Sequence, residues 1–455
     1  MADPTPFVRV VVINFDGWQM TIDCLRSLLA TEWPADRLEV VLVDNGSVDD
    51  VVERVRAEIP TVRIIEPLAN TGFAGGCNLG INAPGKFDLL ALVNNDATVA
   101  TDWLRPLVDA LDEQGGVGAA CPKIVFAERY VEARLAVPDA RQDGRDPRTL
   151  GVRLTAARVD GVRADDRIAF DEGFFAAEDP RRDDGEEIAR WSWRRARLRV
   201  RPGDGPSPSR LAVRVVAPAE RHVTMSTEVD AADVSLAEQD PVWVEVGLDD
   251  HQFDVINNAG SSLYPDGFGG DRGFLERDEG QYDEPAEVFA WCGGAVLLSR
   301  AYLDDVGLFD ERLFLYYEDT DLAWRGRLRG WRYVYEPRSL VRHRHAASSG
   351  VGSKVFRHYT ERNRPLMLVK NAPAGLAWRA ATGVVKRGVG VTVRDLVIRP
   401  LTLRMPVRAD AAHHRGIMTG YLRLLPGMLG DRWTSGRVVA RRSLMSWTQT
   451  KDVAR

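Results

Sequence analysis

The first 122 residues alternate between short apolar runs and amphipathic segments, and no other feature constrains the fold as strongly. The stretches "VRVVVINF", "LEVVLVDN" and "FDLLALVNND" are continuously apolar, as buried strands are, whereas "QMTIDCLRSLLA" and "VDDVVERVRAEI" have the spacing of amphipathic helices. Strands that alternate with helices form a mostly parallel sheet with both faces covered. Ligands bind such sheets beyond the carboxyl ends of the strands, so we expect Asp44 and Asp96, which end two of the apolar runs, to lie at a functional edge.

The remainder of the chain changes character twice. Residues 128–190 are polar and rich in turns, and short stretches such as "LAVRVVA" and "VWVEVGL" then alternate between apolar and polar residues up to residue 252. This pattern predicts a small antiparallel β-sandwich inserted between two α/β segments. A scaffold or a contact within a homo-oligomer is one role for it, and sugar binding is the other. We therefore expect four parts, namely residues 1–127, 128–252, 253–373 and 374–455.

The composition fits a globular protein without a membrane-spanning segment. The 455 residues are 45% hydrophobic and 28% charged, and no run of 18 apolar residues occurs. Four scattered cysteines with no CxxC spacing indicate neither a zinc site nor a disulfide framework. We therefore expect a cytoplasmic protein, and nothing points to nucleic acid as a partner.

The charge is distributed unevenly along the chain. Residues 374–455 contain 15 Lys and Arg against 4 Asp and Glu, a net charge of +11, although the whole chain has a net charge of −6. A basic, partly apolar tail is a candidate for peripheral contact with the inner face of the cell membrane. A solvated helical tail explains the same composition, and both readings stay open.

Two acidic motifs end predicted strands. In "VDNGS", the carboxylate of Asp44 could accept the imide N–H of a uracil or thymine ring, although a turn without a ligand explains the same residues. In "NNDA", Asp96 could bind Mg²⁺ or Mn²⁺, which commonly takes one or two protein carboxylates and fills its other positions with phosphate oxygens and water. The alternative for Asp96 is the N-cap of a helix.

Between these motifs lies the glycine-rich stretch "LANTGFAGGCNLG", which would allow phosphate and sugar to approach the backbone closely. It is neither a GxGxxG after the first strand nor a P-loop, so dinucleotide binding and P-loop chemistry are disfavoured. Further along, "VRHRHAASSG" supplies His343 and His345, either of which could complete a metal site.

The stretch "FLYYEDTDLAWR" contains Glu318, Asp319 and Asp321 ahead of a helix-like run. Acidic residues in the first turn offset the helix dipole and are common for that reason. A carboxylate that serves as a general base would look the same, so these residues alone do not decide between the two.

Taken together, the motifs resemble glycosyltransferase family 2 with the GT-A fold. The resemblance covers residues 8–125 and about 253–371, and it rests on "VVINFDG", "VDNGS", "NTGFAGGCNLGI", "NNDA", "DRGFLERDEGQYDEP", "WCGGAVLLSR", "FLYYEDTDLAWR" and "HRHAAS". More narrowly, the chain is similar to the bacterial rhamnosyltransferase-like branch, which includes galactofuranosyltransferases. The resemblance implies an inverting transfer, dependent on Mn²⁺ or Mg²⁺, from a UDP- or dTDP-sugar to a hydroxyl of a glycan or lipid-linked acceptor in cell-envelope polysaccharide synthesis.

The resemblance also implies roles for individual residues. Asp319 corresponds to the general base, Asp44 to the carboxylate that reads the nucleobase, and Asp96 to the metal ligand. His343 corresponds to a second metal ligand, with His345 as the alternative. The sequence departs from the family's DxD motif at Asn94, whose amide replaces the first acid and could weaken metal affinity.

Further contacts follow from the same comparison of motifs. An aromatic face can stack on a sugar ring and glycines leave room beside it, so "WCGG" is expected to floor the sugar pocket, although an apolar strand explains Trp291 equally simply. The expected donor-binding residues are Asn14, Asp44, Asn70, Gly72, Asn94, Asn95, Trp291, Gly293 and Gly294, and the expected acceptor-binding residues are Asp271, Arg272 and Asp321. Asp321 could instead organise its helix, and Glu318 is expected to be structural.

Two other functions compete with this interpretation. A non-catalytic scaffold that binds carbohydrate or nucleotide-sugar would have no physical need for Asp96, Asp319 and His343 together. A processive membrane-embedded synthase is disfavoured because the sequence contains neither a spanning segment nor a QxxRW pattern after "EDTD".

Overall fold

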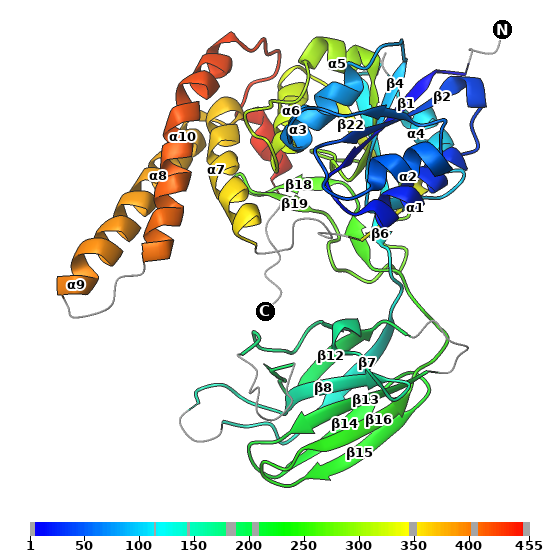
Figure 1. Cartoon of the computed structure of the whole chain (residues 1–455). Coiled ribbons are helices and arrows are strands. Elements are labelled where there is room, and N and C mark those ends of the chain that lie inside the picture. The colour runs from blue at the N-terminus through cyan, green and yellow to red at the C-terminus, as the bar shows by residue number, and fades with distance from the viewer. Residues whose placement is uncertain are drawn as a thin grey trace. The chain divides into compact units, whose positions relative to one another are not determined.

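The computed structural model describes residues 5–112, 115–142, 146–178, 188–202, 209–344, 353–401 and 408–448. The chain forms two compact units (Figure 1), of which one comprises residues 1–127 and 256–455 and the other residues 128–255. The larger unit is therefore assembled from two separate stretches of sequence, and the smaller unit is inserted between them.

A mostly parallel sheet forms the centre of the larger unit. Its main strands follow the order β3-β2-β1-β4-β21-β6-β22-β20, in which β21 and β20 run against the others. The bounds of these strands are β1 (Val8–Asn14), β2 (Leu38–Asp44), β3 (Arg63–Ile65), β4 (Leu89–Asn94), β6 (Val117–Phe126), β20 (Ala286–Glu287), β21 (Ala295–Ser299) and β22 (Arg332–His343). The predicted fold class is confirmed.

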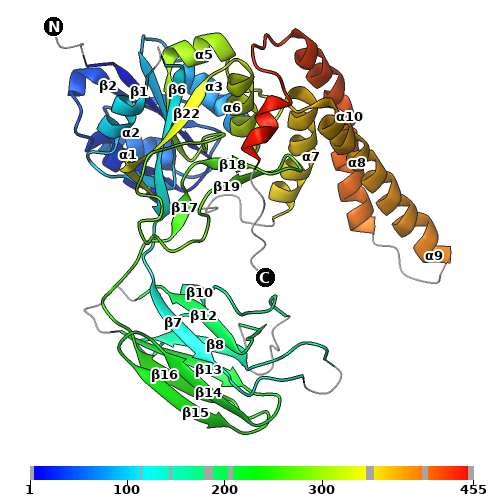
Figure 2. The same cartoon turned by 180° about the vertical axis from the view of Figure 1, so that it is seen from behind.

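Helices cover both faces of this sheet, as the two views show (Figure 1, Figure 2). In β1, Val10 and Val12 pack against one hydrophobic core and Val11 packs against the other, which explains the uninterrupted apolar sequence of the strand. The first core includes residues of α1 (Trp18–Leu29), α2 (Val51–Glu58) and α4 (Leu104–Ala110). The second includes residues of α3 (Gly72–Ile81), α5 (Arg300–Val306) and α6 (Glu318–Leu328).

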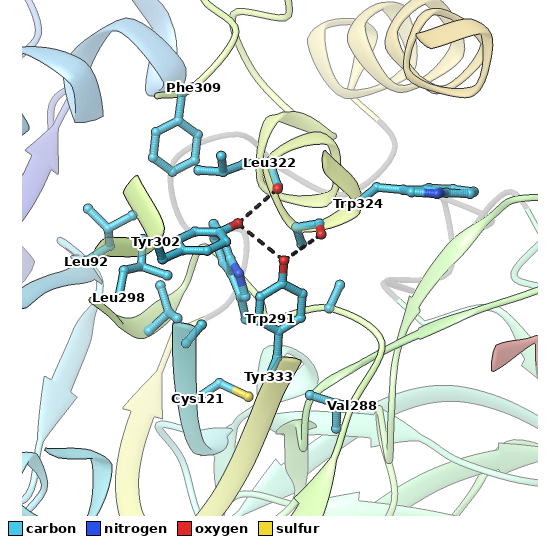
Figure 3. Packing of buried hydrophobic residues seen from close by; sticks show 14 of the residues in the cluster. Leu92, Cys121, Val288, Trp291, Leu298, Tyr302, Phe309, Leu322, Trp324 and Tyr333 are labelled. Atoms are coloured by element: carbon cyan, nitrogen blue, oxygen red, sulfur yellow. Dashed lines mark hydrogen bonds between the residues drawn. The ribbon is translucent and has the colours of Figure 1, made fainter. Parts of the chain in front are cut away.

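Helix α6 is fixed by hydrogen bonds within the second core (Figure 3). The hydroxyl of Tyr302 donates to the carbonyl of Leu322 at 2.9 Å, and the hydroxyl of Tyr333 donates to the carbonyl of Ala323 at 2.6 Å. The two tyrosine rings meet edge to face, with centroids 5.9 Å apart. Because Tyr302 belongs to α5 and Tyr333 to β22, these contacts tie the acidic start of α6 to the central sheet.

The C-terminal part of the larger unit is helical, as the sequence predicts. It contains α7 (Lys354–Asn371), α8 (Ala374–Val393), a π-helical segment (Arg394–Ile398), α9 (Arg399–Leu401) and α10 (Arg408–Thr434). Helices α7, α8 and α10 pack against one another. Within the described residues, no helix is both long enough and apolar enough to cross a membrane.

The smaller unit contains two antiparallel sheets that share one hydrophobic core. One sheet has the order β10-β12-β7-β14-β15, and the other has the order β11-β8-β13-β16 with β9 paired to β8. The strands are β7 (Val131–Ala136), β8 (Arg153–Val159), β9 (Val162–Arg163), β10 (Ile168–Phe170), β11 (Arg190–Trp191), β12 (Arg195–Val200), β13 (Arg210–Val216), β14 (Arg221–Ser226), β15 (Ala231–Leu236) and β16 (Val242–Gly247).

Candidate active site

Three strand ends of the sheet meet in a buried polar network. Asn14, at the end of β1, donates to Asp44 Oδ1 at 3.0 Å and accepts from the amide of Asn95 at 2.9 Å and from the hydroxyl of Thr21 at 2.6 Å. Ser47 also donates to Asp44 Oδ1. The structure thus brings the expected donor-binding residues Asn14, Asp44 and Asn95 together, because parallel strands end at the same edge of the sheet.

The loop before α3 joins this network. Asn45 donates to Asn70 Oδ1 at 3.1 Å and to the carbonyl of Gly72 at 2.9 Å. Gly72 has a φ of +73°, and a Cβ there would lie 2.4 Å from the carbonyl oxygen of Phe314, so only glycine fits this position. The glycine-rich stretch thereby brings the loop of residues 68–72 against the segment that precedes α6.

Asp96 and His343 form the candidate metal site. His343 ends β22, and its Nε2 lies 3.0 Å from Asp96 Oδ1 and 3.3 Å from Asn94 Nδ2. Its Nδ1 lies 3.1 Å from Oδ1 of Asn257 in β17 (Ile256–Asn258). An amide oxygen can only accept, so Nδ1 donates to Asn257, and Nε2 is the ring nitrogen that faces Asp96.

This pair of groups fits a divalent cation. An octahedral ion with ligands about 2.1 Å away places neighbouring ligands about 3.0 Å apart, and Asp96 Oδ1 and His343 Nε2 have that separation. Among the described residues, no group of three or more His, Cys, Asp and Glu side chains could hold a metal. Mn²⁺ and Mg²⁺ commonly fill their remaining positions with phosphate oxygens and water. His345, the alternative ligand, lies outside the described residues.

Asp319, the expected base, lies in the first turn of α6. Its Oδ2 accepts from the backbone N–H of Gly293 at 3.0 Å, and its Oδ1 accepts from the hydroxyl of Thr320 at 3.1 Å. Burial raises the pKa of Asp319, against the lowering effect of these hydrogen bonds. A raised pKa suits a carboxylate that takes a proton from a hydroxyl.

The segment that precedes β21 joins the candidate base to the candidate metal site. Gly293 donates to Asp319, and the carbonyl of Gly294 accepts from the backbone N–H of Asn94 at 3.0 Å. A Cβ on Gly294 would lie 3.8 Å from Cε1 of His343. Side chains and backbone from sequence positions about 200 residues apart therefore meet around two glycines.

The two remaining candidates in the β18–β19 hairpin, formed by β18 (Ser261–Leu263) and β19 (Gly269–Asp271), differ in position. Asp271 is half-buried near Asp319 and His343, and desolvation raises its pKa to about 6, although a hydrogen bond of 2.6 Å from Asn258 opposes the shift. Arg272 instead donates to the carbonyl of Ala259 at 3.0 Å, and its guanidinium lies 4.6 Å from the centroid of the Tyr282 ring. The structure thus places Asp271 near Asp319 and His343, whereas Arg272 contacts Ala259 and Tyr282.

The structure contradicts two contacts expected from the sequence, namely a sugar stacked on Trp291 and an acceptor bound by Asp321. Trp291 has an exposed fraction of 0% and packs edge to face on Phe309, with centroids 6.2 Å apart, so its ring face cannot stack on a sugar (Figure 3). Asp321 also has an exposed fraction of 0% and accepts from Lys370, at 2.9 Å, and from Asn371, at 2.7 Å. Asp321 therefore anchors α6 to α7 and does not face an acceptor, which agrees with its alternative role as a helix organiser.

A cavity of about 460 Å³ adjoins the candidate metal site. Its wall combines strand ends, the loop before α3, the segment before α6 and the start of α7, with Ile13, Phe15, Asn45, Asn70, Gly72, Phe73, Asn94, Asn95, Asp96, Phe314, Leu315, Tyr316, His343, Ser353, Val355 and Phe356 as lining residues. Gly293 lies between this cavity and the base, because a Cβ there would lie 3.3 Å from Phe73 and 3.5 Å from Asp319 Oδ2.

One wall of this cavity has an unusual backbone. Phe314, Tyr316 and Tyr317 have φ values of +65°, +66° and +70°, which bulky residues rarely adopt and which cost about 1–3 kcal/mol each. Asn363, in α7, is buried and donates to the carbonyls of Leu313 at 2.6 Å, Leu315 at 2.8 Å and Tyr316 at 2.9 Å. These hydrogen bonds hold the segment before Asp319 in its strained form.

Sequence reasoning missed Asn363 and Asn257. Asn363 lies within an amphipathic helix and Asn257 within a short strand, and neither position carries a local signal beyond its residue type. The strained segment is also hidden in the sequence. Phe314, Tyr316 and Tyr317 stand at positions of positive φ, where glycine would usually indicate such a backbone.

Part of the chain is similar in sequence to known proteins. Residues 9–151 match the family described as Glycosyl transferase family 2. Two curated proteins of Mycobacterium tuberculosis, from strains CDC 1551 and H37Rv, are each named N-acetylglucosaminyl-diphospho-decaprenol L-rhamnosyltransferase and are 45% identical over 69 residues. Those residues are 15% of this chain and 22% of the relatives, so the chain spans about a fifth of the length of the curated proteins it matches.

Two solved structures are also similar in part. One is GalNAc-T7 with UDP, GalNAc and Mn²⁺, with 12% identity over 95% of this chain and 59% of that protein and a TM-score of 0.45. The other is the mannosyltransferase PcManGT from Pyrobaculum calidifontis with GDP-Man and Mn²⁺, with 13% identity over 92% and 87% and a TM-score of 0.39. Both TM-scores are below 0.5, and we infer nothing about this chain from either structure. The sequence match over residues 9–151, together with the parallel sheet that those residues begin, shows that the chain contains a glycosyltransferase family 2 domain.

Proposed function

We propose that this protein is an inverting, metal-dependent glycosyltransferase that moves a sugar from a dTDP- or UDP-sugar to a hydroxyl of a glycan or lipid-linked acceptor. We favour transfer of a rhamnosyl or galactofuranosyl group in cell-envelope polysaccharide synthesis. The observation that carries the proposal is the convergence of Asp96, His343 and Asp319 around Gly293 and Gly294.

The nucleotide would bind at the strand ends. Asn14 and Ser47 hold Asp44 through Oδ1, which leaves Oδ2 to accept the imide N–H of uracil or thymine. Asn70 and Gly72 line the adjoining cavity, where the backbone can approach sugar and phosphate closely. The cavity volume of about 460 Å³ lies within the range of about 300–1,000 Å³ that is usual for ligand sites.

Asp96 and His343 would hold Mn²⁺ or Mg²⁺ beside the donor diphosphate. Such an ion, when bound, neutralises the charge that develops on the leaving nucleoside diphosphate. Asn94 donates toward the same imidazole and is close enough to contact a phosphate oxygen instead. The amide at this position supplies no charge, so we expect weaker metal binding than two carboxylates would give.

Asp319 would act as the general base. It takes the proton of the acceptor hydroxyl while that oxygen forms a bond to C1 of the sugar, and the bond from C1 to the diphosphate oxygen breaks with its electron pair. Attack from the face opposite the leaving group inverts the anomeric carbon. The hydrogen bonds from Gly293 and Thr320 aim the carboxylate without neutralising it.

We also propose that the protein contacts the inner face of the membrane through its C-terminal helices. Trp378 and Leu401 are 71% and 79% exposed, and Val389 and Val397 are exposed between them. Arg379, Lys386 and Arg394 lie on the same helical segment and would face anionic headgroups. Flotation with anionic vesicles tests this contact, and recovery of Trp378→Ser equal to that of the unaltered chain would contradict it.

A donor screen tests the proposed reaction. We expect hydrolysis or transfer with dTDP-rhamnose or UDP-galactofuranose in the presence of Mn²⁺, little activity with GDP-sugars, and loss of activity with EDTA. Nuclear magnetic resonance of the glycoside product should show an anomeric configuration opposite to that of the donor. A protein that binds no UDP- or dTDP-sugar with either metal would instead be a scaffold with a retired site.

A further inference from the structure

A second cavity, of about 500 Å³, lies beside the C-terminal end of α10. Its wall combines the start of α8, the last turn of α10 and the segment that follows α10, and it includes Pro373, Ala374, Arg432, Arg437, Arg441 and Arg442. It shares no lining residue with the first cavity, which adjoins the candidate metal site. The proposed reaction therefore leaves the second cavity without a role.

The charge of the second cavity is entirely positive. Four of its nine lining residues are arginines, and none is acidic. Asp431, which precedes Arg432, is engaged by Arg312 and lines a different cavity. Within the described part of the chain, no carboxylate forms an ion pair with any of the four arginines. The described residues therefore leave this positive charge without a counter-ion.

Two of the arginines are held in place by backbone carbonyls. Arg432 donates to the carbonyls of Val369 at 2.7 Å and Ala372 at 2.8 Å, at the C-terminal end of α7. Arg441 is 7% exposed and donates to the carbonyl of Arg432 at 2.9 Å. A carbonyl is a neutral acceptor, whereas a buried charge is usually paired with an opposite charge. Burial and the nearby charge of Arg437 lower the pKa of Arg432, as expected where positive charges lie together.

The other two arginines are available to a ligand. Arg437 and Arg442 are exposed, and among the described residues their side chains have no hydrogen-bond or ion-pair partner. The segment that carries them is nevertheless fixed, because the backbone N–H groups of Val438 and Val439 donate to the carbonyl of Leu328 in α6 at 2.9 and 3.0 Å. Each guanidinium offers five N–H donors in a fixed geometry. Two unengaged guanidinium groups thus line the same cavity as the two engaged ones.

We propose that the second cavity binds a phosphate monoester group, which Arg437 and Arg442 hold beside the charges of Arg432 and Arg441. A dianionic phosphate compensates two of the four charges and offers three strong acceptor oxygens, whereas a carboxylate or a phosphodiester carries a single charge. The planar fork of a guanidinium also matches the geometry of phosphate. The proposal does not depend on the proposed reaction, because no residue of the candidate active site lines this cavity.

The exposed apolar side chains beside the cavity define two sources for such a group. Trp433, which follows Arg432, is 83% exposed, and Val438, in the wall of the cavity, is 80% exposed. The headgroup of phosphatidic acid would place these side chains in a bilayer, where their burial is favourable. A soluble phosphate monoester would leave them exposed, so binding with and without vesicles distinguishes the two sources.

The soluble source is tested by calorimetric titration of the full chain with methyl phosphate at about pH 7.5, above the second phosphate pKa of about 6. EDTA is present so that no cation at the candidate metal site takes the phosphate. We expect methyl phosphate to bind at least about 5-fold more tightly than dimethyl phosphate, which carries one charge instead of two. Asp96→Asn should bind methyl phosphate as the unaltered protein does, because Asp96 does not line the second cavity.

The double variant Arg437→Gln, Arg442→Gln removes both unengaged guanidinium groups and should weaken binding of methyl phosphate by at least about 10-fold. Both side chains are exposed and lack partners in the described part of the chain, so the fold should be retained. The matched control is Arg415→Gln, Arg423→Gln, which removes two exposed charges of α10 outside the cavity. The control should bind methyl phosphate as tightly as the unaltered protein.

The bilayer source is tested by flotation with vesicles that contain phosphatidic acid. If recovery falls in the double variant and not in its control, the phosphate belongs to a lipid headgroup. If the two variants float equally and only the double variant loses affinity for methyl phosphate, the phosphate belongs to a soluble compound. Vesicles of phosphatidylglycerol, a phosphodiester, should be bound more weakly than those of phosphatidic acid in the first case.

Three results would overturn the proposal. The first is that the unaltered protein binds neither methyl phosphate nor phosphatidic acid vesicles. The second is that neither probe distinguishes the double variant from its control. The third is equal binding of the monoester and the diester, either as methyl and dimethyl phosphate or as the two kinds of vesicle, which would show an unselective anionic contact in place of a phosphate monoester site.

Discussion

Two carboxylates at the start of α6, those of Asp321 and Asp319, have opposite surroundings. Asp321 packs against α7, where it accepts from Lys370 and Asn371, and it also accepts from Arg325 in its own helix. Asp319 is two residues earlier, about 200° around the helix, and it accepts hydrogen bonds from the backbone N–H of Gly293 and from its neighbour Thr320. The carboxylate of Asp321 thus lies beside compensating positive charges, whereas the hydrogen-bond partners of the half-buried Asp319 are uncharged.

The pKa values of the two carboxylates move in opposite directions. Burial alone would raise the pKa of Asp321, but the charges of Lys370 and Arg325 outweigh it and hold that pKa below its usual range. Burial raises the pKa of Asp319, and the surrounding hydrogen bonds only reduce the shift. We infer that the Asp321 region stabilises the fold, whereas the Asp319 region holds a carboxylate that is ready to accept a proton.

The largest expected effect comes from Asp319→Asn. Transfer should fall by about 10²–10⁴-fold, because the amide cannot accept the acceptor's proton. Stability at neutral pH should stay the same or rise. Because the folded-state pKa of Asp319 is raised, its contribution to stability is present at low pH and is lost as the pH rises through that pKa.

Glu318→Gln is the matched control for this variant. Glu318 is the adjacent residue, is 5% exposed, and has an Oε2 without a hydrogen-bond partner among the described residues. Burial raises its pKa well above the usual range and so favours the neutral acid, which glutamine resembles in shape and charge. Equal losses of transfer in Asp319→Asn and Glu318→Gln would remove the assignment of Asp319 as the base.

Removal of the cation beside Asp310 and Asp321 should lower the stability of the protein. Lys370→Met leaves the carboxylates of Asp310 and Asp321 buried without their shared cation, and we expect a loss of about 3–5 kcal/mol in the free energy of unfolding. Urea denaturation followed by tryptophan fluorescence measures this change. Transfer per folded molecule should change far less than in Asp319→Asn, and a stable Lys370→Met protein would contradict our account of this region.

The same region predicts an acid limit to stability. The charges of Lys370 and Arg312 hold the pKa of Asp310 well below its usual range against the effect of burial, and the pKa of Asp321 is also lowered. The stabilisation is therefore present above the unfolded-state pKa of about 4 and is lost as the pH falls below it. Lys370→Met should weaken this dependence without abolishing it, because Arg312 and Arg325 still contact the two carboxylates, and unfolding at a series of pH values would measure the change.

Asn363→Ala tests whether α7 positions the segment that precedes α6. It removes the hydrogen bonds to Leu313, Leu315 and Tyr316, and we expect a loss of about 1–3 kcal/mol in stability. Because the strained segment lines the first cavity, KM for the donor should rise as well. Arg357→Ala, an exposed change on the same helix, is the control. A change in stability with an unaltered KM would show that Asn363 does not position this segment.

A smaller effect is expected at Asn257, behind the candidate metal site. Asn257→Leu removes the acceptor for His343 Nδ1, and removal of such partners commonly weakens metal binding by about 10–100-fold. Asn257→Asp keeps an acceptor and should retain most of the affinity. Mn²⁺ titration monitored by electron paramagnetic resonance measures both variants without reference to turnover, and equal affinities would exclude an orienting role for Asn257.

The strand ends could be predicted from the sequence because their signals are local. Asp44 and Asp96 follow uninterrupted apolar runs, and the direction of parallel strands places both at one edge. The burial of Trp291 and Asp321 could not be predicted in the same way. Trp291 is buried by packing on Phe309 and Asp321 by its contact with Lys370, and no local sequence pattern indicates either contact. The same limit applies to Asn363, whose role exists only because α7 folds back on the segment before α6.

The most direct test of the central claim is calorimetric titration of a dTDP- or UDP-sugar with and without Mn²⁺. We expect the unaltered protein to bind the donor only with the metal, Asp96→Asn to lose this dependence together with most of the affinity, and Asp319→Asn to bind as the unaltered protein does. Two results would contradict this account, in which a cation at Asp96 and His343 holds the donor beside a separate base. One is donor binding of equal affinity with and without Mn²⁺, and the other is equally weak donor binding by Asp96→Asn and Asp319→Asn.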